Sequence, residues 1–352
     1  MIIKENVPLS TLTTMRLGGP ARYVFEVTEL SDIPEAFKFA RDKSLPTWIL
    51  GGGANTIATD AGFSGVVIIN KIKGIEVISE TSDEVVVRSM GGEVWDDFVA
   101  WTCERGYSGV EALSKIPGSV GAAPVQNIGA YGQDISQVIE SVEAYDTKTG
   151  ELVVIGKEDM NMSYRSTIFN TGKDAGRYFI VAVTFVLENE EHLEPPFYNS
   201  LQQYLDEHNI TDYSPTNIRK AVSAIRAGKL PDPATTPSAG SFFKNIYLSD
   251  EEAAKAKAEG IKIWEKPDGR KMINSGYLIE MAGLKGKILH GMKVSDKAAL
   301  VLINESASAY SDLANARKEI VNAIREKYGF TLEQEPVEIP AGVDVSKKEN
   351  TK

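Results

Sequence analysis

The sequence predicts an α+β protein of two or three domains, and three observations support this fold class. The chain has 352 residues, whereas a single domain commonly holds about 100–200. Short apolar runs typical of strands dominate residues 47–187, and apolar residues at three- and four-residue spacing, typical of helices, become frequent after residue 215. A polar stretch at 188–215 lies between these two parts, so we place the main domain boundary there.

Composition and charge exclude several classes of protein. Apolar residues make up 42% and charged residues 25%, as in ordinary globular proteins, and the net charge of −11 argues against binding to nucleic-acid phosphates. The single cysteine excludes a disulfide framework, and the three scattered histidines give no reason to expect a metal. No signal peptide and no apolar run of about 20 residues is visible, so we expect a cytoplasmic protein without a membrane span.

In the first part, a helix is expected before residue 47, with Ser31 or Asp32 as its cap and Pro34 in its first turn. A second helix is expected over 93–105, ending at Gly106. The segment 106–137 has no regular apolar period. Strands are expected at 47–50, 66–69, 75–79, 84–90, 139–144, 151–155 and 178–187.

In the second part, Ser214 and Pro215 begin a helix, and Ser249 with Glu252 forms the capping box of another. A short helical stretch is expected at 274–283, a strand at 299–304 and a long helix at 311–328, which Gly329 ends. The polar tail, 341–352, is expected to be frayed.

The triple-glycine turn Gly51-Gly52-Gly53-Ala54-Asn55-Thr56 directly follows a strand. Consecutive glycines leave backbone N–H groups unshielded, which suits a pyrophosphate. A dinucleotide fingerprint fails because no helix follows the glycines, and a Walker loop fails because no Gly-Lys-Ser/Thr follows them. The alternative that remains is a sharp structural turn between two strands.

The segment 116–132 is long, irregular and free of charged residues. Its backbone polar groups need partners, and its glycines permit close approach by something flat. A large apolar cofactor with a polar tail would satisfy it, and a tightly packed interdomain loop is the alternative.

Three further motifs can carry chemistry. Arg165 lies among aromatic residues and can hold a carboxylate, although a surface arginine is the simpler explanation. Ser241 follows a glycine but lacks the G-x-S-x-G pattern and a histidine partner, so it is a proton donor, a ligand or a structural serine rather than a hydrolase nucleophile. Arg226 and Lys229, at a helix C-terminus, can meet a diphosphate or complement the helix dipole.

Taken together and in order, six segments resemble the flavin-dependent UDP-N-acetylenolpyruvoylglucosamine reductases of peptidoglycan synthesis. They are LGGGANTIATDAGFSGVVI (50–68), IPGSVGAAPVQNIGAYGQD (116–134), YRSTIF (164–169), KLPDP (229–233), AGSFFKN (239–245) and LEQEPVEI (332–339). The resemblance implies an FAD-binding unit of the vanillyl-alcohol-oxidase type, with subdomains 1–70 and 71–215, followed by an α+β substrate-binding domain, 216–340. It also implies a cytoplasmic enzyme, which we expect to be a monomer.

The resemblance implies that non-covalent FAD is held by two segments, with its ring system between them; no histidine or cysteine lies near 51–65. The implied cofactor residues are Gly51, Gly52, Gly53, Ala54, Asn55, Thr56, Pro117, Gly118, Ser119, Gly121, Ala122, Gln126, Asn127, Gly129, Ala130 and Tyr131.

The implied reaction reduces a nucleotide-sugar enolpyruvyl ether with NADPH. Arg165 and Glu335 would stabilise the enolate-like charge at the substrate carboxylate, Glu335 with a raised pKa, and Ser241 would donate the proton. The implied substrate-binding residues are Tyr164, Tyr198, Arg226, Lys229 and Asn245, with Tyr198 on a loop that closes over the diphosphate.

The C-terminal motif departs from the usual Leu-Glu-Pro-Glu-Val of the family, because Gln334 stands where the proline is common and Pro336 follows the second glutamate. This leaves the choice between Glu333 and Glu335 open. Two other functions also stay open: a flavoenzyme of the same fold that oxidises a small alcohol or lactone with oxygen, and a nucleotide-sugar binding protein without redox activity.

Overall fold

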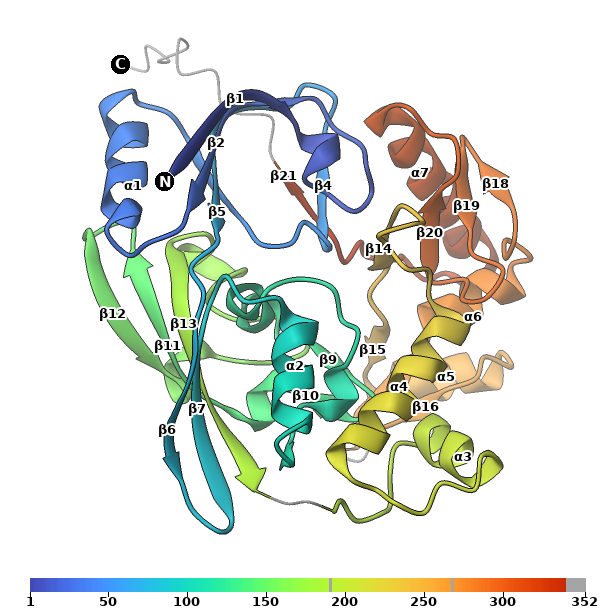
Figure 1. Cartoon of the computed structure of the whole chain (residues 1–352). Coiled ribbons are helices and arrows are strands. Elements are labelled where there is room, and N and C mark those ends of the chain that lie inside the picture. The colour runs from blue at the N-terminus through green and yellow to red at the C-terminus, as the bar shows by residue number, and fades with distance from the viewer. Residues whose placement is uncertain (190–191, 267–268, 340–352) are drawn as a thin grey trace.

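The computed structural model describes residues 1–189, 192–266 and 269–339. The polar tail expected at 341–352 lies outside these residues. Two sheets with their covering helices form the left half of Figure 1, and a body of helices and short strands from the chain after residue 198 forms the right half.

The first sheet has four strands, with the order β1-β2-β5-β3. They are β1 (Ile2–Pro8), β2 (Pro20–Val27), β3 (Thr47–Leu50) and β5 (Phe63–Asn70). Helix α1 (Asp32–Asp42) buries Ile33, Phe37 and Ala40 against β2 and β5, as its apolar spacing predicts. Ser31 makes no side-chain cap; instead the carboxylate of Asp32 accepts hydrogen bonds from the backbone N–H groups of Thr28 and Glu29.

The second sheet is antiparallel, with the order β12-β11-β13-β7-β6 and a short strand, β8, paired with β13. Its members are β6 (Ile75–Glu80), β7 (Glu84–Met90), β8 (Tyr107–Ser108), β11 (Ile139–Asp146), β12 (Glu151–Gly156) and β13 (Tyr178–Asn189). Helix α2 (Trp95–Cys103) covers it through Trp95 and Phe98, which contact Phe185. The strands expected at 75–90 and 139–187 are confirmed.

The segment between α2 and β11 is built from short 3-10 helices at Glu111–Leu113, Val120–Gln126 and Ile135–Gln137 and the two-residue strands β9 (Gly129–Ala130) and β10 (Gln133–Asp134). Turns this short cannot show a long apolar period, which explains the irregular pattern of the sequence.

Two helices follow the second sheet. Helix α4 (Pro215–Lys229) begins at Ser214 as expected, and it packs through Ile218 and Val222 against α3 (Asn199–Glu207) and the 111–113 turn. Helix α3 was not predicted, because it lies in a polar stretch and buries only Leu201 and Leu205.

The apolar core of the C-terminal body consists mostly of its own residues, and Met15, Leu17 and Ile57 from the first part of the chain complete it. Its elements are β14 (Ser238–Ser241), β15 (Ile246–Leu248), α5 (Asp250–Ala258), β16 (Trp264–Glu265), β17 (Lys271–Ile273), α6 (Ser275–Met281), β18 (Ile288–Leu289), β19 (Met292–Val294), β20 (Val301–Asn304) and α7 (Tyr310–Tyr328). The Ser249–Glu252 capping box of α5 is confirmed, and Gly329 ends α7 with a φ of +76°.

The last described strand, β21 (Val337–Ile339), leaves this body and pairs in parallel with β4 (Thr56–Ala58), directly after the triple-glycine turn. Figure 1 shows the red β21 beside the blue β4. Neither strand was predicted, because each has three residues and its partner lies about 280 positions away.

Candidate active site

The triple-glycine turn leaves β3 and touches the 118–122 segment. A Cβ on Gly51 would lie 2.8 Å from the Ala122 Cβ, and one on Gly52 would lie 2.9 Å from the Gly118 Cα. Gly53 has a φ of +66°, and a Cβ there would lie 1.9 Å from the Leu12 carbonyl oxygen. The two segments are in contact at these positions because their residues have little or no side chain, and both also line the cavity described next.

A cavity of about 380 Å³ is lined by both segments. Its lining includes every residue from Gly51 to Thr56, and also Pro117, Gly118, Ser119, Gly121, Ala122 and Gln126. Other walls come from β3 and from Asn70, Phe169, Asn170, Tyr178, Ile180 and Val337. No charged residue, histidine or cysteine is among the described residues that line it. A ligand phosphate here would be met by backbone N–H groups rather than by cations.

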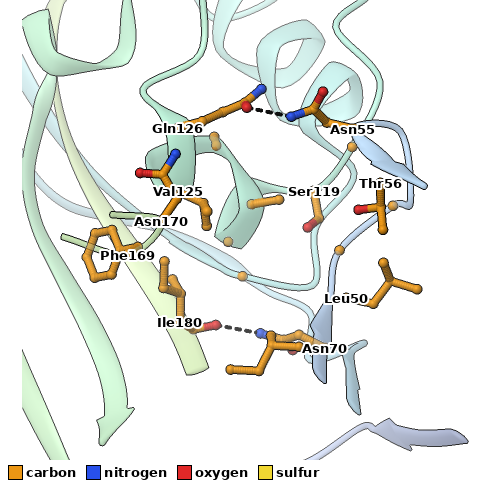
Figure 2. Close-up of a pocket in the computed structure, with 18 of the residues that line it drawn as sticks. Leu50, Asn55, Thr56, Asn70, Ser119, Val125, Gln126, Phe169, Asn170 and Ile180 are labelled. Atoms are coloured by element: carbon orange, nitrogen blue, oxygen red, sulfur yellow. Dashed lines mark hydrogen bonds between the residues drawn. The ribbon is translucent and has the colours of Figure 1, made fainter. Parts of the chain in front are cut away.

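Polar side chains lie at opposite ends of this cavity. The Asn55 amide donates to the Gln126 side-chain oxygen at 2.5 Å, and the Asn70 amide donates to the Ile180 carbonyl at 2.8 Å (Figure 2). Trp48, which also lines the cavity, has a buried indole N–H without a hydrogen-bond partner among the described residues.

Four of the expected cofactor residues do not line the cavity: Asn127, Gly129, Ala130 and Tyr131. The Asn127 side chain is used internally, because it donates to the Ser163 carbonyl and accepts from the Ser136 N–H. The Asn127 and Gly129 carbonyls accept hydrogen bonds from Arg165. These residues therefore lie between the cavity and the arginine.

Arg165 and Glu335, which are 170 positions apart, form an ion pair of 2.7 Å between Nε and Oε1. Arg165 has a φ of +56°, an unusual backbone conformation for a residue with a side chain. Its carbonyl is held by the Asn170 amide at 3.0 Å, and Asn170 also lines the cavity. The ion pair thus adjoins the cavity, and Arg165 is not the surface arginine that was the simpler explanation.

The carboxylate of Glu335 is 8% exposed, and burial raises its pKa above the ordinary value, partly offset by Arg165 and Lys244. The expected direction of this pKa shift is confirmed. Glu333, by contrast, pairs with Lys244 at 2.5 Å and its side chain is 72% exposed. The geometry favours Glu335 as the carboxylate of the site.

Ser241 ends β14 and lies beside the Glu335 segment, because the Glu335 N–H donates to the carbonyl of the next residue, Phe242, at 2.9 Å. Asn245 follows in the same motif and accepts a hydrogen bond from the Ser275 N–H. The Tyr164 ring packs edge-to-face against the Tyr247 ring, with 5.0 Å between their centroids. The Arg165 guanidinium lies 5.1 Å from the Tyr164 ring centroid, so Tyr164 adjoins one member of the ion pair and the backbone of the Ser241–Asn245 motif adjoins the other.

A second cluster contains Tyr131, Tyr198 and Arg226. The two tyrosine rings lie 6.0 Å apart, and Arg226 donates to the Lys115 carbonyl while its buried Nε has no partner among the described residues. Burial lowers the pKa of Arg226, partly offset by Tyr131. Lys229, one turn further along α4, is exposed. An incompletely paired guanidinium beside two tyrosines suits a ligand anion.

An ion pair fixes α4 in place. Arg219 donates to both carboxylate oxygens of Asp96, at 2.6 and 3.1 Å, and the Lys115 N–H donates to the same carboxylate at 2.7 Å. Although burial raises it, hydrogen bonds from Arg219 and Lys115 hold the pKa of Asp96 well below its usual range. Arg226 and the start of the 116–132 segment are thus attached to one anchor.

Several residues of the site were not predicted. Asn70, at the end of an apolar strand, and Asn170, directly after YRSTIF, carry a recognisable signal because a polar amide follows an apolar run. Tyr178 and Val337 carry none, because nothing in their own segments indicates a cavity.

In the part of the chain that the structure describes, no group of three or more His, Cys, Asp or Glu side chains is placed to hold a metal. Within the same residues, no helix has both the length and the apolar character needed to cross a bilayer.

Comparison with known proteins identifies two domains and close relatives. Residues 21–156 match the family model "FAD binding domain", and residues 232–339 match "UDP-N-acetylenolpyruvoylglucosamine reductase, C-terminal domain". The UDP-N-acetylenolpyruvoylglucosamine reductase of Pseudomonas fluorescens is 37% identical over 95% of this chain and 98% of its own. That of Ralstonia nicotianae is 36% identical over 96% and 99%.

Among solved structures, the UDP-N-acetylenolpyruvylglucosamine reductase of Thermus caldophilus is similar with a TM-score of 0.65 and 22% identity. The match covers 96% of this chain and all of that one, so the two share a fold across almost their whole length.

Proposed function

Because the chain belongs to the UDP-N-acetylenolpyruvoylglucosamine reductase family, we propose that it reduces UDP-N-acetylglucosamine enolpyruvate to UDP-N-acetylmuramate with NADPH, through FAD, in the synthesis of peptidoglycan precursors. The resemblance seen in six sequence segments is confirmed, and so is the α+β fold class. The observation that carries the proposal is the buried Arg165–Glu335 pair beside a charge-free cavity in the FAD-binding part.

The cavity residues fit FAD in two respects. The glycine turn at 51–53 offers unshielded backbone N–H groups to a pyrophosphate, and the apolar walls suit a flat ring. The described lining contains no histidine or cysteine for a covalent link, which supports non-covalent binding. FAD, when bound, supplies the hydride that it receives from NADPH to the enolpyruvyl carbon.

The protein's own residues stabilise the developing negative charge and donate a proton. Hydride addition leaves a carbanion next to the substrate carboxylate, so negative charge develops on that carboxylate as an enolate. Arg165 offsets this charge, and Glu335 with a raised pKa offers a proton in a hydrogen bond. Ser241 Oγ donates its proton to the strongly basic carbon that follows.

The second cluster is suited to the diphosphate. We propose that Arg226, Lys229 and Tyr198 bind it, with Tyr198 on a loop that closes over it, and that Tyr164 and Asn245 orient the sugar-bearing end.

Residues 1–70 and 71–215 would hold FAD and residues 216–340 the nucleotide sugar. The enzyme is proposed to be a monomer, and its use of NADPH and a nucleotide sugar, which are made inside the cell, supports a cytoplasmic location.

Anaerobic spectroscopy tests the function. The purified protein should be yellow, should lose its colour with NADPH, and should regain it when the enolpyruvyl nucleotide sugar is added, with formation of the lactyl ether. Recovery of colour only with oxygen would favour an oxidase, and a colourless preparation without flavin would favour a binding protein.

Replacing Gly52 by valine should weaken FAD binding by about 10- to 100-fold, because a side chain there must displace the Gly118 backbone, 2.9 Å from the added Cβ. The measurement is the flavin content of the purified protein and its affinity on titration. Gly156→Val is the matched control, since a Cβ at Gly156 meets nothing within 4 Å. Equal FAD affinities of the two variants would contradict the assigned cradle.

A further inference from the structure

The segment that carries Glu335 is held on both sides by backbone contacts. Lys244 N–H donates to the Glu333 carbonyl at 2.8 Å, and Glu335 N–H donates to the Phe242 carbonyl at 2.9 Å. Two residues later, the Val337 N–H donates to the Asn55 carbonyl in the glycine turn, at 2.9 Å. The segment therefore spans from the Ser241 motif to the FAD cavity.

Side chains alternate along this segment. Glu333 and Glu335 contact Lys244 and Arg165, whereas Gln334, between them, contacts Arg317. Residues in extended backbone alternate between opposite faces, so Arg317 lies on the face opposite the ion pair.

Arg317, from the middle of α7, contacts two places on the segment. Its Nη1 donates to the Gln334 side-chain oxygen and to Glu338 Oε1, each at 2.5 Å, and its Nη2 lies 3.4 Å from the Tyr310 hydroxyl. The Tyr310 hydroxyl in turn donates to Glu338 at 2.7 Å. Gln334 completes the arrangement by donating to the Pro336 carbonyl at 2.7 Å.

We propose that Arg317 is a positioning residue for substrate reduction: by holding Gln334 and Glu338 on either side of Glu335, it keeps the Glu335 carboxyl against Arg165. The proposal rests on the proposed function, and it adds a residue that touches neither the substrate nor FAD. A guanidinium suits this role because its planar donors reach two acceptors at once, which an ammonium does less well.

The consequence is a selective kinetic defect. The FAD cavity lining does not include Arg317, so flavin reduction by NADPH should not depend on it. Substrate reduction should depend on it, because a displacement of about 1 Å in a reacting group costs about 100-fold in rate.

The test compares Arg317→Met with Arg325→Met in the full-length, FAD-loaded enzyme. Arg325 lies on the same helix, is exposed, and contacts Thr331 rather than 334–338. Stopped-flow measurements give the two half-reactions separately. We expect Arg317→Met to slow substrate reduction by about 10- to 100-fold and to change flavin reduction less than twofold, with Arg325→Met like the wild type in both.

A pH profile separates positioning from simple stability. The groups that face Glu335 are Arg165, Lys244 and Tyr164. If the segment loosens, the Glu335 carboxyl gains solvent, and the high-pH fall of substrate reduction should move to lower pH. Arg317→Lys, which keeps the contact with Glu338, should restore part of the rate and of the profile.

An unchanged rate of substrate reduction in Arg317→Met would overturn the proposal. A purely structural role would also overturn it. In that case Arg317→Met and Arg317→Lys would both slow the two half-reactions equally and melt at a lower temperature, and the pH profile of substrate reduction would not move. Failure of the wild type to reduce the enolpyruvyl substrate would instead contradict the proposed function.

Discussion

Replacing Ser241 by alanine should slow reduction of the enolpyruvyl substrate by about 10²- to 10⁴-fold, the usual range for the loss of a general acid. Flavin reduction by NADPH should persist, because the serine is outside the cavity lining and would act only after hydride transfer. Stopped-flow absorbance of the flavin measures both steps.

The matched control is Ser238→Ala, the same change on the same strand, β14, at a buried position. It should leave both half-reactions near the wild type. If Ser241→Ala impaired flavin reduction as strongly as substrate reduction, or if Ser238→Ala reproduced its effect, Ser241 would be a structural residue of β14 and not the proton donor.

Replacing Glu335 by glutamine should slow substrate reduction by about 10²- to 10³-fold, as expected when one charge-stabilising group is altered. In the wild type, the rate should fall as pH rises through the raised pKa of Glu335, because the proton that the carboxyl offers is lost. Glutamine does not ionise, so the variant should lack this high-pH fall.

The substitution Glu335→Gln should affect stability differently from rate. A carboxyl whose pKa is raised in the folded state destabilises the protein above that pKa, because ionisation is easier in the unfolded chain. The melting temperature of Glu335→Gln should therefore gain on that of the wild type as the pH rises from the ordinary glutamate value towards neutrality. The gain should vanish below the ordinary glutamate value of 4.5.

Glu333→Gln is the control for both measurements, since Glu333 is two positions away, largely exposed and paired with Lys244. It should have nearly wild-type kinetics and melting. A strong defect in Glu333→Gln together with a mild one in Glu335→Gln would transfer the role to Glu333.

Local apolar spacing was sufficient to predict the long helices. The stripes of α4 and α7 repeat over several turns, and the capping box of α5 uses residues only three apart. Strands β4 and β21 could not be predicted in this way, because each exists through pairing with the other. Strand β1 is exposed along almost its whole length, so it lacks the alternation that indicates a strand.

The site residues also fall into those that local sequence predicts and those that it does not. The glycine turn and the uncharged segment can be recognised from their composition, so the sequence predicted cavity-lining residues at 51–56 and 117–126. Arg165 and Glu335 are linked only in space, and their joint role came from family resemblance rather than from spacing. Arg317 carried no signal, because an arginine on an amphipathic helix ordinarily faces water.

The parallel pairing of β21 with β4 joins the last described strand of the C-terminal body to the strand that directly follows the glycine turn. A fragment that stops near residue 215 would lack the strand that pairs with β4, directly after the glycine turn, and with it Val337 from the cavity wall. We therefore expect the amino-terminal part alone to have an incomplete cavity, with β4 left without its partner strand.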